Sequence, residues 1–174
     1  MHRTNFRIGD IVYLFMSDER RVTFKTRVID EGCKRTDTPY WVVKPSSHLT
    51  YILELVWEYK GDKLTEGELV KYGFKGGRSI QHPMKNNTEL LKYIDGVFDT
   101  NGKDIPKEVM EIADACFCGV IYVGVFDGKD VYGEKPSDEY PPEPTGLPSL
   151  ILWDGEKAEI VSGIESLDIL SHIE

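Results

Sequence analysis

The sequence predicts an α+β protein, because segments with the period of a strand and segments with the period of a helix occur in both halves of its 174 residues. The first half carries β-rich segments followed by two helical ones. The second half carries two hairpin signals between two helical segments. With 40% hydrophobic residues, the chain is long enough to bury one core or two small ones.

The β-rich segments lie between residues 11 and 59. Ile11–Met16 follows a Gly-Asp turn, and Val22–Asp30 alternates between its two sides, which is typical of a half-buried strand. The intervening SDERR turn predicts a hairpin. Two further strands are expected, the short YWVVK segment (Tyr40–Lys44) and the longer TYILELVWEY segment (Thr50–Tyr59), which is rich in β-branched and aromatic residues.

Two helices are expected next. Thr65 and Glu68 have the spacing of a capping box, which predicts a helix start. Gly73 suits the position just past the end of that helix, where positive φ is favoured. Asn86 or Asn87 is expected to cap the second helix, TELLKYIDGVF. Its apolar side is predicted to hold four residues: Leu90, Leu91, Ile94 and Phe98.

The second half is expected to form a helix, two hairpins and a final helix. A boundary is predicted at residues 99–104 (DTNGKD), which are turn formers, and Pro106 marks the first turn of the next helix. Asp127-Gly128 and Asp154-Gly155 predict hairpin turns. The proline-rich, acidic residues 135–148 between the hairpins predict an exposed loop.

The last helix is predicted from a second capping box, formed by Ser162 and Glu165. Its packed side is expected to carry four apolar residues: Ile164, Leu167, Leu170 and Ile173.

Charge is distributed unevenly along the chain. Residues 1–100 carry 16 Lys+Arg against 14 Asp+Glu, a net charge of +2, whereas residues 101–174 carry 5 against 16, a net charge of −11. This asymmetry predicts two domains, 1–100 and 104–174, with different partners. Four basic residues are candidates for phosphate contacts: Arg20, Arg21, Lys25 and Arg27. A solvated strand face is the alternative explanation for them.

Composition argues against several classes of protein. No apolar run approaches the roughly 20 residues that a membrane span needs, and MHRTNFRIGD lacks an apolar signal core. We therefore expect no membrane partner. Three cysteines, Cys33, Cys116 and Cys118, make an odd count that suits free thiols in a reducing cytoplasm. Their spacing relative to the four histidines matches no zinc site, so no metal or cofactor is expected.

The glycine-rich connection GFKGGRSIQHP, Gly73–Pro83, raises the question of a ligand site. Its spacing differs from a phosphate-binding loop, and it follows a predicted helix, so nucleotide hydrolysis is not expected. The glycines permit close backbone approach, and Arg78 and Gln81 offer groups that pair with base edges or phosphates. A plain helix-to-helix connection is the alternative. No catalytic motif is found elsewhere, which favours a non-enzymatic binding module.

The order of features in residues 7–98 resembles the PUA-like superfamily and, within it, the EVE-type domains. RIGDIVYLFMS resembles their Gly-Asp strand and FKTRVID the strand that follows it. TYILELVWEY, the helix LTEGELVKYGF, the loop KGGRSIQHP and the helix ELLKYI then follow in a similar order. The resemblance implies a β-barrel that binds RNA, or DNA carrying a modified base, and holds an extruded base in an aromatic pocket.

The resemblance implies pocket residues on the strands and in the glycine-rich loop: Tyr13, Phe24, Trp41, Trp57, Gly77, Arg78, Ser79 and Gln81. Two alternatives stay open. Aromatic residues on strands commonly belong to the core. The acidic second domain could instead occupy a basic surface of a protein partner, which would make the chain an interaction or inhibitor module.

Overall fold

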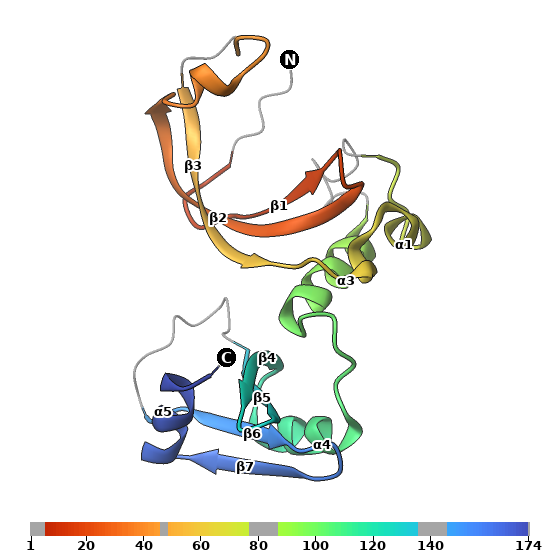
Figure 1. Ribbon diagram of the computed structural model, residues 1–174, viewed down its shortest axis with the longest axis vertical. Helices are drawn as coiled ribbons and strands as arrows, with labels where there is room; N and C mark the ends of the chain where they lie inside the picture. Colours follow the sequence, from red (N-terminus) through yellow and green to blue (C-terminus); the bar gives the residue numbers. More distant parts are fainter. Residues whose placement is uncertain (1–5, 46–48, 77–86, 136–145, 174) are drawn as a thin grey trace. The chain divides into compact units, whose positions relative to one another are not determined.

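The structure is a computed structural model that describes residues 6–45, 49–76, 87–135 and 146–173. The predicted α+β class is confirmed, since the described residues form two antiparallel sheets together with helices (Figure 1). The chain divides into two compact units, Met1–Phe98 and Asp99–Glu174. Among the described helices, none has the length and apolar character needed to cross a membrane.

The first unit is built on a three-stranded sheet with β2 in the middle. Strands β1 (Ile11–Met16) and β3 (Leu49–Glu58) both pair antiparallel with β2 (Arg21–Lys34). The register of β2 shifts once against β1 and three times against β3. Such bulges bend strands and increase their twist, and Figure 1 shows β2 and β3 strongly curved. The β-barrel implied by the resemblance is not found among the described residues, because β1 and β3 each pair with β2 and not with each other, which leaves the sheet open.

The segment between β2 and β3 corrects one prediction. The expected strand Tyr40–Lys44 is absent; the chain forms a 3-10 helix, η1 (Thr38–Tyr40), and then irregular backbone. Pro39 in the first turn favours this helical start. Asp37 accepts hydrogen bonds from residues on both sides of η1, which closes the segment on itself. Local hydrogen bonds therefore override the β-propensity of the valines.

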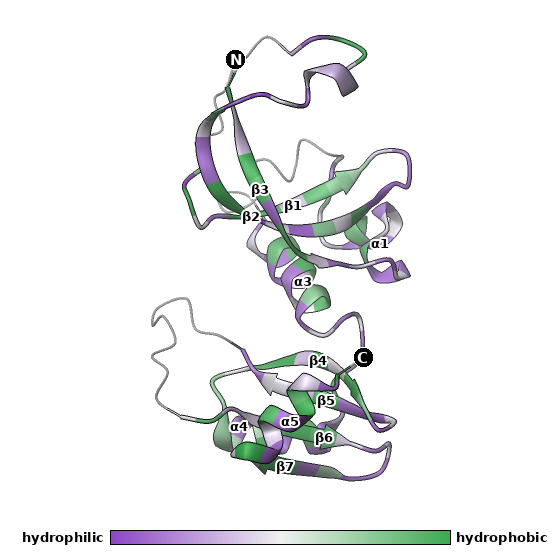
Figure 2. Ribbon diagram, turned by 60° about the vertical axis from the view of Figure 1, so that its left-hand side comes forward, coloured by the Kyte–Doolittle hydropathy of each residue, from purple (hydrophilic) through white to green (hydrophobic). Residues whose placement is uncertain are grey.

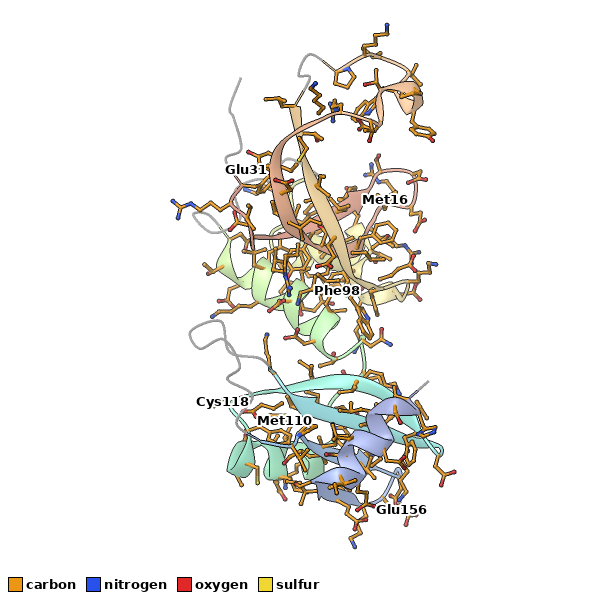
Figure 3. The ribbon with its side chains drawn as sticks, turned by 90° about the vertical axis from the view of Figure 1, so that its left-hand side faces the viewer. Met16, Glu31, Phe98, Met110, Cys118 and Glu156 are labelled. Atoms are coloured by element: carbon orange, nitrogen blue, oxygen red, sulfur yellow. The ribbon has the colours of Figure 1, made fainter. Side chains whose placement is uncertain are left out.

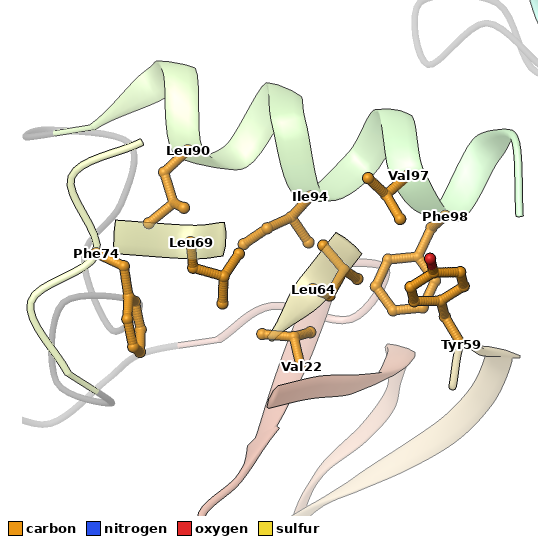
Figure 4. Packing of buried hydrophobic residues seen from close by; sticks show 9 residues of the cluster. All are labelled: Val22, Tyr59, Leu64, Leu69, Phe74, Leu90, Ile94, Val97 and Phe98. Carbon is orange, nitrogen blue, oxygen red and sulfur yellow. The ribbon is translucent and has the colours of Figure 1, made fainter. Parts of the chain in front are cut away.

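Helices pack against one face of this sheet. The 3-10 helix η2 (Asp62–Leu64) leads into α1 (Glu66–Lys71), and α3 spans Thr88–Asp99. Figure 4 shows the nine buried residues of the resulting core: Val22, Tyr59, Leu64, Leu69, Phe74, Leu90, Ile94, Val97 and Phe98. Because Val22 belongs to β2, the core joins the sheet to both helices.

The predicted end of α1 is confirmed. Gly73 has φ +85°, its amide donates to the carbonyl of Val70 at 3.0 Å, and the amide of Phe74 donates to the carbonyl of Leu69 at 3.1 Å. This pair of bonds defines a Schellman motif, in which a residue without Cβ is favoured. Phe74 and Leu69 also pack together in the core, so the turn fixes where the chain leaves the helix.

The predicted starts of the two helices have different outcomes. Asn87 caps α3, because its Oδ1 accepts from the amide of Leu90 at 3.0 Å. The prediction of a capping box at the start of α1 is wrong. Thr65 stands at the N-cap, but its hydroxyl donates to the carbonyl of Asp62 at 3.0 Å and makes no cap hydrogen bond. The preceding 3-10 turn thus takes up the hydroxyl that the capping box would need.

The second unit is a four-stranded meander with a helix on each face. Its elements in chain order are α4 (Lys107–Cys116), β4 (Val120–Phe126), β5 (Lys129–Glu134), β6 (Ser149–Trp153), β7 (Ala158–Ser162) and α5 (Ile164–Ser171). Sheet order follows chain order. Tyr132 and Ile151 face α4, whereas Val131 and Leu150 face α5, as strand alternation requires. The predicted turn at Asp127-Gly128 joins β4 to β5 with positive φ at both residues.

The predicted packing of the last helix is wrong in part. Ser162 ends β7, with its hydroxyl 2.8 Å from that of Ser149, and Gly163 at φ +84° is the N-cap, so the second capping box does not form. The buried side of α5 holds Ser166 and Ile169. Ile173 is partly buried as expected, but the other three predicted core residues are exposed: Ile164, Leu167 and Leu170.

Candidate nucleic-acid interface

Two of the predicted site residues lie under helix α3. The hydroxyl of Tyr13 donates to Asp95 Oδ1 at 2.6 Å, and Lys25 Nζ lies 2.7 Å from the same oxygen. The Tyr13 ring stacks on Phe98 with centroids 5.5 Å apart. Tyr13 and Lys25 are also direct cross-strand neighbours. Both side chains therefore join the sheet to α3, and the ammonium group of Lys25 is balanced by a carboxylate.

The other predicted phosphate contacts have different surroundings. Arg20 forms an ion pair with Glu66, and Arg21 donates to the carbonyl of Lys60 at 2.6 Å. These bonds tie the β1–β2 turn to α1, and the start of β2 to the segment between β3 and η2. Arg27 is exposed and makes no ion pair with another described residue. Of the four candidate phosphate contacts, only Arg27 has a charged group that makes no such contact with another described residue.

The predicted aromatic residues are spread along the sheet. Phe24 is partly buried opposite Leu14, and Trp57, opposite Lys25, is 40% exposed. Trp41 lies beyond the other end of β3, which begins at Leu49. The eight residue steps from Leu49 to Trp57 correspond to roughly 26 Å of strand. The structure thus does not bring Trp41 and Trp57 together, and one base cannot stack on both. Four predicted residues lie outside the described part of the chain: Gly77, Arg78, Ser79 and Gln81.

The distal segment, which we define as residues 34–45, forms a different arrangement. Arg35 Nε donates to Asp37 Oδ1 at 3.0 Å, and Trp41 Nε1 donates to Asp37 Oδ2 at 2.8 Å. The guanidinium carbon of Arg35 lies 5.0 Å from the centroid of the Trp41 ring, within the range of a cation–π contact. The hydrogen bond from Trp41, assisted by Arg35, lowers the pKa of Asp37 below its ordinary value.

This triangle of Arg35, Asp37 and Trp41 orients an apolar tip. Tyr40 is 89% exposed, Trp41 is 49% exposed, and Val42 and Val43 are more exposed than the tryptophan. Figure 3 shows the segment beyond Glu31 projecting from the end of the sheet, away from Phe98 at the helix-covered end. Keeping four consecutive apolar residues exposed to water is unfavourable and adds nothing to the core, which makes the tip a candidate for binding.

Cations flank this tip. Lys34 and Lys44 are exposed on either side of it, and residues 34–45 contain three cations and one carboxylate. Exposed aromatic rings next to Lys and Arg are the combination that proteins use to hold unpaired nucleic acid, since rings stack on bases and cations meet phosphates. The distal segment therefore has the chemistry that was predicted for the strands nearer to α3.

Sequence reasoning missed the roles of Arg35, Asp37 and Tyr40. A usable signal was present, because the carboxylate of Asp37 stands two residues after an arginine and four before a tryptophan, across a Thr-Pro turn. The high β-propensity of YWVV favoured a strand there instead of a turn. A strand would have turned alternate side chains to opposite faces, whereas the turn exposes all four.

The described residues give no support for thiol or metal chemistry. All three cysteines are free thiols. A hydrogen bond with Asp30 raises the pKa of Cys33, which disfavours a reactive thiolate there. No group of three or more His, Cys, Asp or Glu side chains within the described ranges is arranged to hold a metal ion. The cytoplasmic location stays a prediction.

No protein family, curated protein or solved structure matches this chain.

Proposed function

We propose that the first unit is a PUA-like, EVE-type module that binds nucleic acid, RNA or DNA with unpaired or modified bases, through its distal segment. The order of two strands, a further strand, a short helix and a longer helix supports the family proposal. The observation that carries the functional proposal is the exposed pair Tyr40 and Trp41, held between cations at the end of the sheet.

The distal segment is suited to stacking. Asp37 fixes the Trp41 indole through its Nε1–H, and Arg35 covers one side of the ring, so the indole is oriented before a ligand arrives. Pre-orientation lowers the entropy that binding would otherwise lose. A base that stacks on one exposed ring gains about 1–3 kcal/mol whatever its identity. The site thus accounts for binding to a flipped or single-stranded base, and not for reading a duplex sequence.

Phosphate contacts would come from the flanking cations. Lys34 and Lys44 stand at the two ends of the distal segment, and Arg27 is exposed on the same strand as Lys34. Each such contact releases counterions, so affinity should fall as salt rises. The pocket residues implied by the resemblance, Arg78, Ser79 and Gln81, remain a prediction for the reading of a base edge.

The proposal is tested by fluorescence anisotropy with labelled single-stranded RNA and DNA oligonucleotides, with and without 5-methylcytosine, at several salt concentrations. We expect Tyr40→Ala and Trp41→Ala each to weaken binding about tenfold, the loss of one stacked base. Trp57→Ala is the matched control, because Trp57 is exposed to a similar degree but lies on β3, away from the distal segment. Equal losses for Trp57→Ala and Trp41→Ala, or no binding at low salt, would contradict the proposal.

A further inference from the structure

Helix α5 is fixed to the second unit by one side. Ser166 and Ile169 are buried against the sheet, and Ser166 Oγ lies 2.6 Å from the carbonyl oxygen of Pro148 and 2.7 Å from that of Gly163. Ile169 packs with Val161 of β7 in the core on this face. The buried side thus consists of one small polar residue, Ser166, and one apolar residue, Ile169. Most of the helix surface therefore lies outside the core.

The remaining surface of α5 carries an apolar stripe. Ile164 is 80% exposed, Leu167 is 45% exposed and Leu170 is also exposed, and their spacing of three places them along one side of the helix. Leu147, half exposed, continues the row at the start of the helix, where its side chain approaches Gly163. We call Leu147, Ile164, Leu167 and Leu170 the α5 stripe.

Carboxylates accompany the stripe. Glu165 and Asp168 are exposed on α5 itself, and the helix contains no lysine or arginine. In Figure 2 the ribbon of α5 changes between green and purple along its length, as this mixture of leucine, isoleucine and acids requires. Over residues 149–173 the sequence has five carboxylates and one lysine. The surface therefore combines apolar area with a negative field.

We propose that the α5 stripe docks a basic amphipathic helix of a partner protein. An exposed apolar row on a helix is covered most simply by the apolar side of another helix, whose leucines interleave with it. Lysines or arginines flanking that apolar side would meet Asp168, which lies one helical turn after Ile164, and the nearby charge of Glu165 adds to the attraction, which speeds encounter and fixes orientation. The same carboxylates repel nucleic acid and anionic lipid, so the charge selects a cationic protein segment. This partner site is separate from the distal segment and does not depend on the function proposed for it.

The probe for the test is a fluorescein-labelled synthetic peptide of about 18 residues, made of leucine and lysine with all leucines on one helical side. A scrambled peptide of the same composition, with leucines all round, is its control. Binding to the full chain is followed by anisotropy at low and high salt. We expect a Kd on the order of 10 µM, at least about tenfold tighter than for the scrambled peptide, and weaker at high salt.

Variants of the full chain locate the contact. Ile164→Ser/Leu167→Ser should weaken peptide binding about tenfold or more, and Glu165→Gln/Asp168→Asn should weaken it a few-fold and reduce its salt dependence. Matched controls should leave binding unchanged: Val70→Ser on α1, and Glu108→Gln/Asp114→Asn on α4. Circular dichroism checks folding. If the double variant unfolds, the single variant Ile164→Ser is measured in its place, because Ile164 is 80% exposed and its substitution should leave the fold intact.

Three outcomes would overturn the proposal. The first is equal binding of the ordered and scrambled peptides, which would indicate charge attraction alone. The second is binding that survives the loss of Ile164 and Leu167. The third is self-association of the full chain in sedimentation that these substitutions abolish, which would make a second copy the occupant of the stripe.

Discussion

The two ends of strand β2 carry similar residues in different situations. Near α3, Lys25 lies beside Tyr13, and both contact Asp95. Past the far end, Arg35 lies over Trp41, and both contact Asp37. Each end thus holds a cation, an aromatic ring and one carboxylate. The near group joins two elements of the core, whereas the far group supports an exposed tip.

The difference lies in where the carboxylate comes from. Asp95 is 82 residues from Tyr13 in sequence, and α3 brings it to the sheet together with Ile94 and Phe98. Asp37 is local, four residues from its tryptophan, and none of the buried clusters formed by the described residues includes the segment around it. The same residue types therefore become structural when a distant helix supplies their partner, and available for binding when a turn does.

The largest effect is expected in the core beneath α3. Ile94→Ala should lower the free energy of unfolding by about 2–5 kcal/mol, because a fully buried side chain leaves a cavity between helix and sheet. Urea denaturation followed by circular dichroism measures this. Val70→Ala, at an exposed position on α1, should change it by less than about 0.5 kcal/mol. Similar losses in both variants would contradict the packing described here.

The second prediction concerns the near-end group. Asp95→Ala should lower the free energy of unfolding by about 1–3 kcal/mol, since it leaves a largely buried ammonium group and a phenol without this carboxylate. Adding Lys25→Met to Asp95→Ala should restore part of the loss. A double-mutant cycle in urea tests the coupling, and strict additivity of the two substitutions would show that the ion pair contributes nothing.

The third prediction uses pH to probe the far-end group. Because Trp41 and Arg35 lower the pKa of Asp37, the ordered arrangement is favoured above the ordinary carboxyl value of about 3.8 and is lost as pH falls below it, through the folded-state pKa. In a Trp57→Phe/Trp153→Phe background, Trp41 fluorescence should change in that acid range before global unfolding. Asp37→Asn should abolish the transition. An unchanged transition in Asp37→Asn would assign it to another group.

The smallest effect is expected from Arg27. Arg27→Ala should leave stability within about 0.5 kcal/mol of the parent, because its side chain is exposed. It should reduce the slope of log affinity against log salt for oligonucleotides by about one, the loss of one phosphate contact. Lys92→Ala on α3 is the matched control, as its lysine is exposed and away from the sheet face of the helix. Equal slopes for the two variants would remove Arg27 from the interface.

Much of the fold could be predicted because its signals are local. Asp127-Gly128, Gly73 and Asn87 specify turn or cap geometry through their own backbone or side chain, and the structure has them in those roles. The capping box at Thr65 failed because the neighbouring 3-10 turn competed for its hydroxyl. The inward side of α5 was misjudged because the chain turns at Gly163, with φ +84°, between β7 and the helix, and after this turn Ser166 and not Leu167 is buried against the sheet.

The candidate site was less predictable, for a physical reason. Tyr13 and Lys25 have the composition of a binding surface, and only the arrival of Asp95 from α3 makes them part of the interior. No residue near them in the sequence predicts the contact with Asp95. Tyr40–Lys44 read as a strand because propensity ignores the hydrogen bonds that Asp37 offers on both sides of the turn.

The most direct test of the central claim is ultraviolet crosslinking of the full chain to RNA that contains 4-thiouridine, with the attached peptides mapped by mass spectrometry. Binding by the distal segment predicts crosslinks at Tyr40 and Trp41, lost at high salt and in Trp41→Ala. Crosslinks confined to Tyr13 and Trp57, or to residues 77–81, with none in residues 34–45, would contradict it.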